Sequence, residues 1–164
     1  MGRKQEVIMA KSLRYFMREE AKQEQIVSVP GPDTIKDENG NVVQLEIKKL
    51  GNDRIEQINK MYETKTLLKD KKGNFVVHNG VAVYKIDRDR NRAARHMIVE
   101  ALVYPDLKDK KLMEFFGCAD ITEMPLKVFP DNKEYAHVSG QVLKVLNLAD
   151  EEPDEKELED AKNS

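Results

Sequence analysis

The sequence predicts an α+β protein, in which an N-terminal helix and antiparallel β-hairpins pack with a C-terminal module of several helices. Asn39-Gly40, a typical hairpin turn, precedes a strand in which apolar and polar residues alternate from Val43 to Lys48. After Asp87 the apolar residues change to helical spacing, and acidic pairs three residues apart recur at helix starts. Because the strands precede the helices, the fold belongs to the α+β class.

Length and charge predict one domain with a charged tail. The chain has 164 residues, and we place a single domain at 12–148, between an extension at 1–11 and an acidic tail at 149–164. From Asp150 onward there are eight acidic and two basic residues, so this segment carries a charge of −6. Such a segment is too charged to fold alone, and we expect it to be flexible and disordered.

Composition excludes several classes of function. The other 149 residues hold 26 basic and 22 acidic groups, a net charge of +4, which is far from the strongly positive charge of a dedicated nucleic-acid binder. Cys118 is the single cysteine, so no intrachain disulfide forms and a reducing compartment is indicated. No apolar run reaches the roughly 20 residues of a membrane span. We therefore expect a cytoplasmic protein that does not contact a membrane.

The first half of the chain predicts short helices between strands. Ser12 is a candidate cap for a helix with Leu13, Phe16 and Met17 on one face. A strand at 26–29 and 34–36, interrupted by Pro30-Gly31-Pro32, should lie at a sheet edge, because proline cannot donate to a ladder. Asn52 is the expected cap of a helix with apolar residues Ile55, Ile58 and Met61. Residues 65–86, which contain two further turn signals, predict a β-excursion of two or three short strands.

The second half predicts consecutive helices separated by caps. One buried stripe is formed by Ala93, Ala94, Met97, Ile98, Ala101 and Leu102. Pro105 should end that helix, and Asp106, Asp120 and Asp131 should cap the next three, the first of them closed by Gly117. The last helix, at about 132–148, places on one stripe Tyr135, Val138, Val142, Val145 and Leu146.

Motifs for catalysis or metal binding are missing from the sequence. The three histidines, His78, His96 and His137, are scattered and lack the spacing of zinc ligands. Neither a Gly-x-Ser-x-Gly elbow nor a glycine-rich phosphate loop occurs. We predict a protein that is not an enzyme, with no cofactor and no bound metal.

Three arginines, Arg88, Arg92 and Arg95, fall on the polar side of the predicted helix. They could bind phosphates or an acidic partner, which would make them a partner-binding site. Alternatively they form the solvated face of an amphipathic helix, partly neutralised by Asp87 and Asp89. We favour the second interpretation, because a phosphate-binding face has more basic neighbours.

A second candidate partner-binding site combines aromatic and apolar residues of the C-terminal module. Most such side chains belong to a core, but short helices joined by tight caps bury little surface each. Part of this cluster is therefore expected to form a groove for an apolar helix. Its members are Phe115, Phe116, Phe129, Tyr135, Val138 and Val142.

The order of these signals resembles a known family. Ser12-Leu13-x-x-Phe16 precedes the hairpin, and later come Val103-Tyr104-Pro105-Asp106-Leu107, Phe116-Gly117 and Pro130-x-x-x-Glu134-Tyr135. Together these segments resemble the XkdN-like tail assembly chaperones of phages and prophages of Gram-positive bacteria, over residues 12–148. Residues 1–11, the excursion at 65–86 and the acidic tail lie outside the resemblance.

The resemblance implies a non-enzymatic role in phage assembly. Such a chaperone binds the tape measure protein, with the major tail tube protein as a further partner, assists assembly of the tail tube in the bacterial cytoplasm, and is not expected in the mature virion. Two alternatives stay open: a structural component of the phage tail, and a nucleic-acid-associated phage or regulatory factor that uses the arginines.

Overall fold

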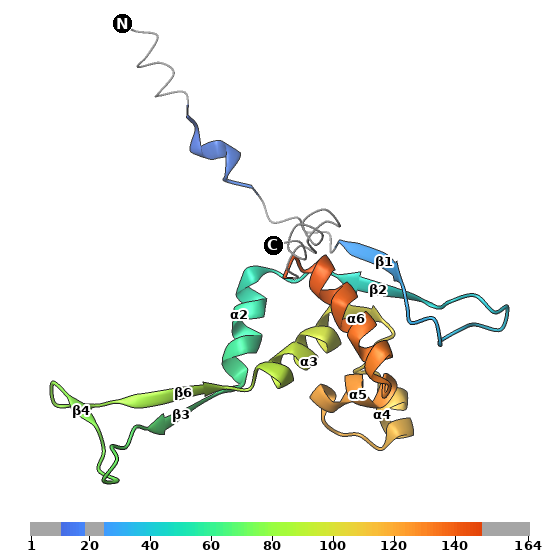
Figure 1. Cartoon of the computed structure of the whole chain (residues 1–164). Helices are drawn as coiled ribbons and strands as arrows, with labels where there is room; N and C mark the ends of the chain where they lie inside the picture. Colours follow the sequence, from blue (N-terminus) through green and yellow to red (C-terminus); the bar gives the residue numbers. More distant parts are fainter. Residues whose placement is uncertain (1–10, 19–24, 149–164) are drawn as a thin grey trace, which may run out of the picture.

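The computed structural model describes residues 11–18 and 25–148 (Figure 1). The predicted acidic tail and residues 1–10 of the predicted extension lie outside this part of the chain, and the domain boundaries stay a prediction. Strands and helices both occur, with antiparallel pairing in every described sheet, which confirms the α+β class. The first described element is a single 3-10 turn, η1 (Leu13–Tyr15), where a short helix was predicted, and the Ser12 side chain caps it as expected by accepting a hydrogen bond from the Arg14 N–H.

A three-stranded antiparallel sheet supports the core. Its order is β1 (Ile26–Pro30), β2 (Gln44–Lys48) and β7 (Leu102–Tyr104). The predicted alternation is confirmed in β2, where Leu45 and Ile47 are buried. As predicted from its prolines, β1 lies at an edge of the described sheet. No strand is predicted at β7, because the helical spacing of apolar residues places Leu102 in the preceding helix.

The hairpin turn between β1 and β2 is built by an aspartate and a glycine. The Asp37 carboxylate accepts hydrogen bonds from the N–H groups of Asn39 and Asn41, both at 2.9 Å. Gly40 has a φ of 81°, which glycine adopts without steric cost. The turn was predicted, but Asn39 is not among the described residues with positive φ.

Two helices pack against each other, and the second of them also contacts β7. Gly51, and not the predicted Asn52, is the N-cap of α2 (Asn52–Met61), in which Ile58 is buried and Met61 is exposed. α3 (Arg90–Ala101) is capped by Asp89 and buries six side chains. The predicted apolar stripe is largely confirmed, although the helix ends at Ala101 and the chain then extends into β7.

An arm, which we define as residues 63–88, projects from the end of α2 and the start of α3 (Figure 1). β3 (Glu63–Leu67) pairs antiparallel with β6 (Tyr84–Arg88) along its whole length. Beyond this ribbon lie a turn at Asp70–Gly73 and a small hairpin of β4 (Val77–His78) and β5 (Val81–Ala82). The β-excursion predicted at 65–86 is thus confirmed, with more strands than expected.

The C-terminal part consists of the short helix α4 (Lys110–Phe116), the 3-10 turn η2 (Ile121–Glu123), the short helix α5 (Met124–Val128) and the longer helix α6 (Asn132–Val145). Asp120 caps η2 and Asp131 caps α6, as predicted. Gly117 closes α4 with a φ of 59°. The prediction for Asp106 was wrong, since Asp109 caps α4 and Asp106 holds the turn before it.

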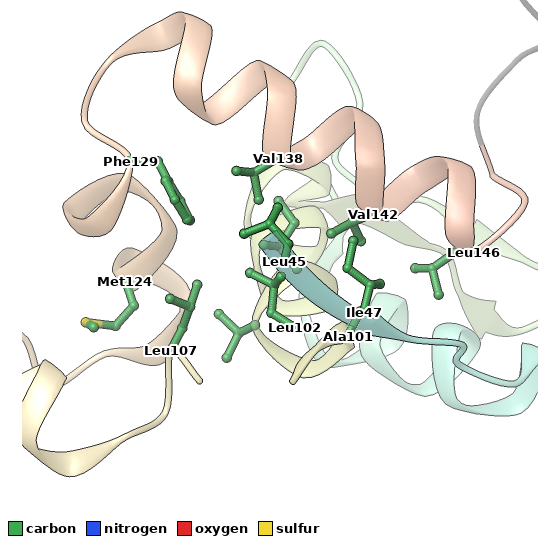
Figure 2. Close-up of a cluster of buried hydrophobic side chains, with 12 residues drawn as sticks. Leu45, Ile47, Ala101, Leu102, Leu107, Met124, Phe129, Val138, Val142 and Leu146 are labelled. Carbon is green, nitrogen blue, oxygen red and sulfur yellow. The ribbon is translucent and has the colours of Figure 1, made fainter. Parts of the chain in front are cut away.

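The core lies where β2, α3, β7 and α6 meet (Figure 2). Leu45 and Ile47 from β2 contact the buried face of α6, and Leu107, Met124 and Phe129 extend the cluster toward the short helices. No residue of the arm belongs to this buried cluster. The core therefore depends on the sheet and the helical module, and the arm is an appendage to it.

Candidate partner-binding surfaces

Only part of the predicted aromatic site is accessible in the structure. Phe115, at the end of α4, has 81% of its surface exposed and meets the Phe116 ring edge-on, with 4.9 Å between ring centroids. Phe116 is half-buried against the core. By contrast Phe129, Val138 and Val142 are buried, so their side chains hold the helices together and offer a partner no surface in this structure.

Tyr135, in the first half of α6, is half-buried and packs against the core cluster. Burial raises the pKa of its phenol above the ordinary value of 10.0, so the phenol stays protonated and able to donate a hydrogen bond at neutral pH. The surface left for a partner on the helical module therefore consists of Phe115 with the accessible parts of Phe116 and Tyr135.

The three arginines do not form one solvated helix face. Arg88 belongs to β6 and pairs with Glu63 across the ribbon at 2.8 Å. Arg92 pairs with Asp120 at 3.1 Å, and its guanidinium lies over the Tyr62 ring. The neutralising partners predicted from sequence, Asp87 and Asp89, are not the ones found for these side chains.

Arg95 is the most buried of the three and joins α3 to η2. Its Nε donates to the Thr122 carbonyl oxygen at 2.8 Å, and its Nη2 lies 3.4 Å from a Glu123 carboxylate oxygen. Thr122 is itself buried, and its hydroxyl donates to Asp120. That bond and the adjacent backbone N–H lower the pKa of Asp120. Arg92 and Arg95 thus hold η2 against α3. A partner that bound these two arginines would have to break those contacts.

A polar chain links α2 to α3 beside the base of the arm. Tyr62 hydrogen-bonds His96 Nδ1, and His96 Nε2 lies 3.3 Å from Glu100, which also accepts from Arg54 at 2.8 Å. When the His96 proton is on Nε2, each of these four side chains has a hydrogen-bond partner within the row. The Arg54 hydrogen bond lowers the pKa of Glu100 below its ordinary value of 4.5. These contacts hold the two helices from which the arm emerges.

A shallow cleft of about 320 Å³ lies between α2, α3 and the end of α6. Its floor is apolar, with Ala93, Met97 and Leu143, and Arg88 and Arg90 lie at its rim. We predicted a groove around Phe115, Phe116 and the last helix, but this cleft involves the opposite end of α6 and neither phenylalanine. The apolar surface on α4 is therefore a protruding patch rather than part of this cleft.

The arm carries an apolar surface that the sequence did not identify as a site. Cross-strand pairs place Leu67 opposite Tyr84 and Lys65 opposite Ile86, so Leu67, Tyr84 and Ile86 share one side of the ribbon, here called the arm face. Thr64, Thr66, Lys85 and Asp87 occupy the other side. The signal was the alternation Tyr84-Lys85-Ile86-Asp87, which we read only as secondary structure.

Other kinds of site receive no support within the part of the chain that the structure describes. There, no group of three or more His, Cys, Asp or Glu side chains is arranged to hold a metal ion. Among the described helices none is both long and apolar enough to cross a membrane.

Comparison with known proteins decides the family. Residues 13–162 match the family described as phage XkdN-like tail assembly chaperone protein. The chain belongs to this family. The match begins at the first described helical turn and includes both the arm and most of the acidic tail, which the sequence resemblance had left out.

Relatives agree with this membership in the XkdN-like family. The phage-like element PBSX protein XkdN of Bacillus subtilis (strain 168) is 27% identical over 151 residues, which cover 92% of this chain and 93% of that protein. The uncharacterized protein YqbN of the same strain is 28% identical and covers 91% of each chain. A crystal structure of YqbN superposes with a TM-score of 0.62 at 24% identity, covering 84% of this chain and 98% of that one, and supports the fold.

Proposed function

We propose that this XkdN-like protein binds the tape measure protein in the bacterial cytoplasm, assists assembly of the tail tube around it, and leaves before the virion is complete. It acts by binding and not by catalysis. The family is one of phage tail assembly chaperones, which supports the assembly role. The observation that carries the binding role is the exposed Phe115, a large apolar side chain with 81% of its surface accessible.

The physical argument concerns aggregation. A long helical protein with apolar stripes exposes them until the tube subunits cover it, and such surface associates non-specifically. A small protein that presents apolar side chains among charged ones can cover those stripes reversibly while keeping the complex soluble. Lys111 precedes Phe115 by one helical turn on α4 and provides charge of this kind.

Within this proposal, Phe115, Phe116 and Tyr135 contact the tape measure protein. Co-expression with the full chain should raise the soluble fraction of the tape measure protein encoded in the same genome. Phe115→Glu should abolish that increase, because the new carboxylate would have to lose water on binding. Phe115→Leu is the matched control and should keep most of it, and both variants should keep the wild-type circular dichroism spectrum, since Phe115 is exposed.

Two results would argue for another function. Recovery of the chain in purified virions would favour a structural tail component. Salt-dependent DNA binding that is lost on replacing the arginines would favour a nucleic-acid role. The pairing of Arg88, Arg92 and Arg95 with carboxylates does not favour that second role.

A further inference from the structure

β6 alternates apolar and polar residues like a strand with one buried face, yet the apolar side chains on that side of the arm are exposed. The arm face consists of Leu67, Tyr84 and Ile86, with 40%, 55% and 51% of their surfaces accessible. Phe75, near the tip, is exposed as well. Alternation of apolar and polar residues is typical of strands with one covered face. Among the described residues, nothing packs over this face closely enough to bury it.

The low stability expected of an isolated two-stranded ribbon also indicates that a partner covers the arm face. A two-stranded ribbon is marginally stable in water unless its apolar face packs against another surface. The base of the arm is fixed by the Glu63–Arg88 ion pair and by the hydrogen bond from the Asp89 N–H to the Tyr62 carbonyl oxygen. Beyond the base, the ribbon carries a row of apolar side chains that would gain free energy from any complementary apolar contact.

The charge of the arm selects among possible occupants. The arm contains six basic and three acidic residues, a net charge of +3. Two of its lysines border apolar side chains: Lys65 lies opposite Ile86, and the Lys69 ammonium lies 5.4 Å from the centre of the Phe75 ring. A second copy of the chain would bring an equally basic arm against this one, and like charges repel. An occupant with acidic residues beside its apolar ones meets no such repulsion.

The acidic segment of this same chain is a weaker fit. Residues 150–164 carry a charge of −6, but Leu158 is the single large apolar residue among them. That segment could compete for the lysines without covering Leu67, Tyr84 and Ile86. The remaining occupant is an apolar segment with acidic flanks that belongs to another protein.

We propose that the arm face binds an amphipathic, acidic-flanked segment of the protein that this chaperone assists. This inference rests on the proposed function and adds a second contact surface, distant in sequence from Phe115. Apolar contact with Leu67, Tyr84 and Ile86 supplies affinity, and Lys65 and Lys69 select for acidic flanks.

Neighbouring positions on β6 provide a matched test, because Tyr84 and Lys85 point to opposite sides of the ribbon. The photoreactive residue p-benzoylphenylalanine is placed at position 84 or 85 of the full chain, which is co-expressed with the tape measure protein and irradiated. Mass spectrometry then identifies the cross-linked peptides. We expect cross-links from position 84 to a tape measure segment with acidic flanks, and background levels from position 85.

Other occupants would appear in the same experiment and would overturn the inference. A cross-link from position 84 to a second copy of the chain would identify a dimer interface. An intrachain cross-link to residues 150–164 would identify the chain's own tail as the occupant. Equal yields from positions 84 and 85 would indicate non-specific contact.

A second set of variants separates this inference from the proposed function. Leu67→Ser, Tyr84→Ser and Ile86→Ser are combined, and a control combines Thr64→Ser, Thr66→Ser and Lys85→Ser on the opposite side. We expect co-purification of the tape measure protein to be lost in the first set and kept in the control. If both sets keep it, the arm inference fails while the function stands; if the wild-type chain itself fails to co-purify, both fail.

Discussion

Gly31 and Gly140 differ in the space that surrounds them. A Cβ atom at Gly31 would lie 2.4 Å from the Val43 carbonyl oxygen, so the glycine permits close approach of the two backbones where β1 leads into the loop. A Cβ atom at Gly140, within α6, would have no atom of a neighbouring element within 4 Å. The first glycine is required by packing and the second is not.

Gly140→Ala should therefore stabilise the protein by about 1 kcal/mol, the difference in helix propensity between the two residues. Gly31→Ala should destabilise it by roughly 1–3 kcal/mol, because the hairpin must move apart to accept the methyl group. Urea unfolding followed by circular dichroism measures both free energies. A destabilising Gly140→Ala would show that α6 packs against something at this position.

The free energy of unfolding should depend on pH through Glu100. Because the Arg54 hydrogen bond lowers its pKa in the folded state, Glu100 stabilises the fold above its ordinary value of 4.5, and this contribution is lost as pH falls through the lowered value. The wild-type chain should thus be more stable than Glu100→Gln at pH 7, and the difference should shrink below about pH 4.5. Urea unfolding at a series of pH values measures it.

The control for this comparison is Glu56→Gln, which removes the exposed i,i+4 ion pair with Lys60. Such a pair contributes about 0.2–0.5 kcal/mol, so its loss should change stability little at any pH. If Glu56→Gln and Glu100→Gln gave the same pH profile, the Arg54 contact would not be the source of the effect.

At the scale of elements, side-chain contacts from α3 hold the short turns in place. η2 contains only three residues and cannot be stable alone, because a helical turn is costly to nucleate. Its position is fixed by the Asp120 cap, by the burial of Thr122 and by Arg92 and Arg95 reaching across from α3.

Arg95→Ala should cost roughly 1–3 kcal/mol, because the Thr122 carbonyl oxygen would lose its 2.8 Å donor in a half-buried location. Arg88→Ala loses an ion pair on the exposed ribbon and should cost less than about 1 kcal/mol. Chemical denaturation compares the two. Equal losses would mean that the arginines act as a single charged face, as the sequence alone suggested.

At the scale of the whole molecule, the chain divides into a packed body and the arm. The buried cluster draws on β2, α3, β7 and the C-terminal helices, and the arm contributes none of its members. This division separates stability, which resides in the body, from the partner contact that we propose for the arm.

Replacing residues 64–87 by a short Gly-Asn turn between Glu63 and Arg88 should therefore leave the body folded. We expect the melting temperature to change by less than about 4 °C, which corresponds to about 1 kcal/mol for a domain of this size. Differential scanning calorimetry makes the measurement. A large loss would show that the arm stabilises the body through the Tyr62–His96 contact region.

Much of the local structure was predictable, because its signals lie within a few residues of where they act. The Asn39-Gly40 turn, the alternation in β2, the left-handed Gly117 and the caps at Asp120 and Asp131 are short-range features. The family resemblance, which rested on such features in order, was confirmed by the family match. The partner-binding surfaces were predictable only in part.

What the sequence by itself determined was the α+β class, the positions of most turns and caps, and the family. Tertiary structure alone decided that Leu102 pairs with β2 and does not extend the preceding helix. It also decided that Phe129 is buried while Phe115 is exposed, and that Arg95 donates a hydrogen bond to η2. These outcomes depend on residues distant in the chain, and periodicity reports only which residues share a face. Whether that face is covered, as in α6, or left open, as in the arm, depends on what the fold brings beside it.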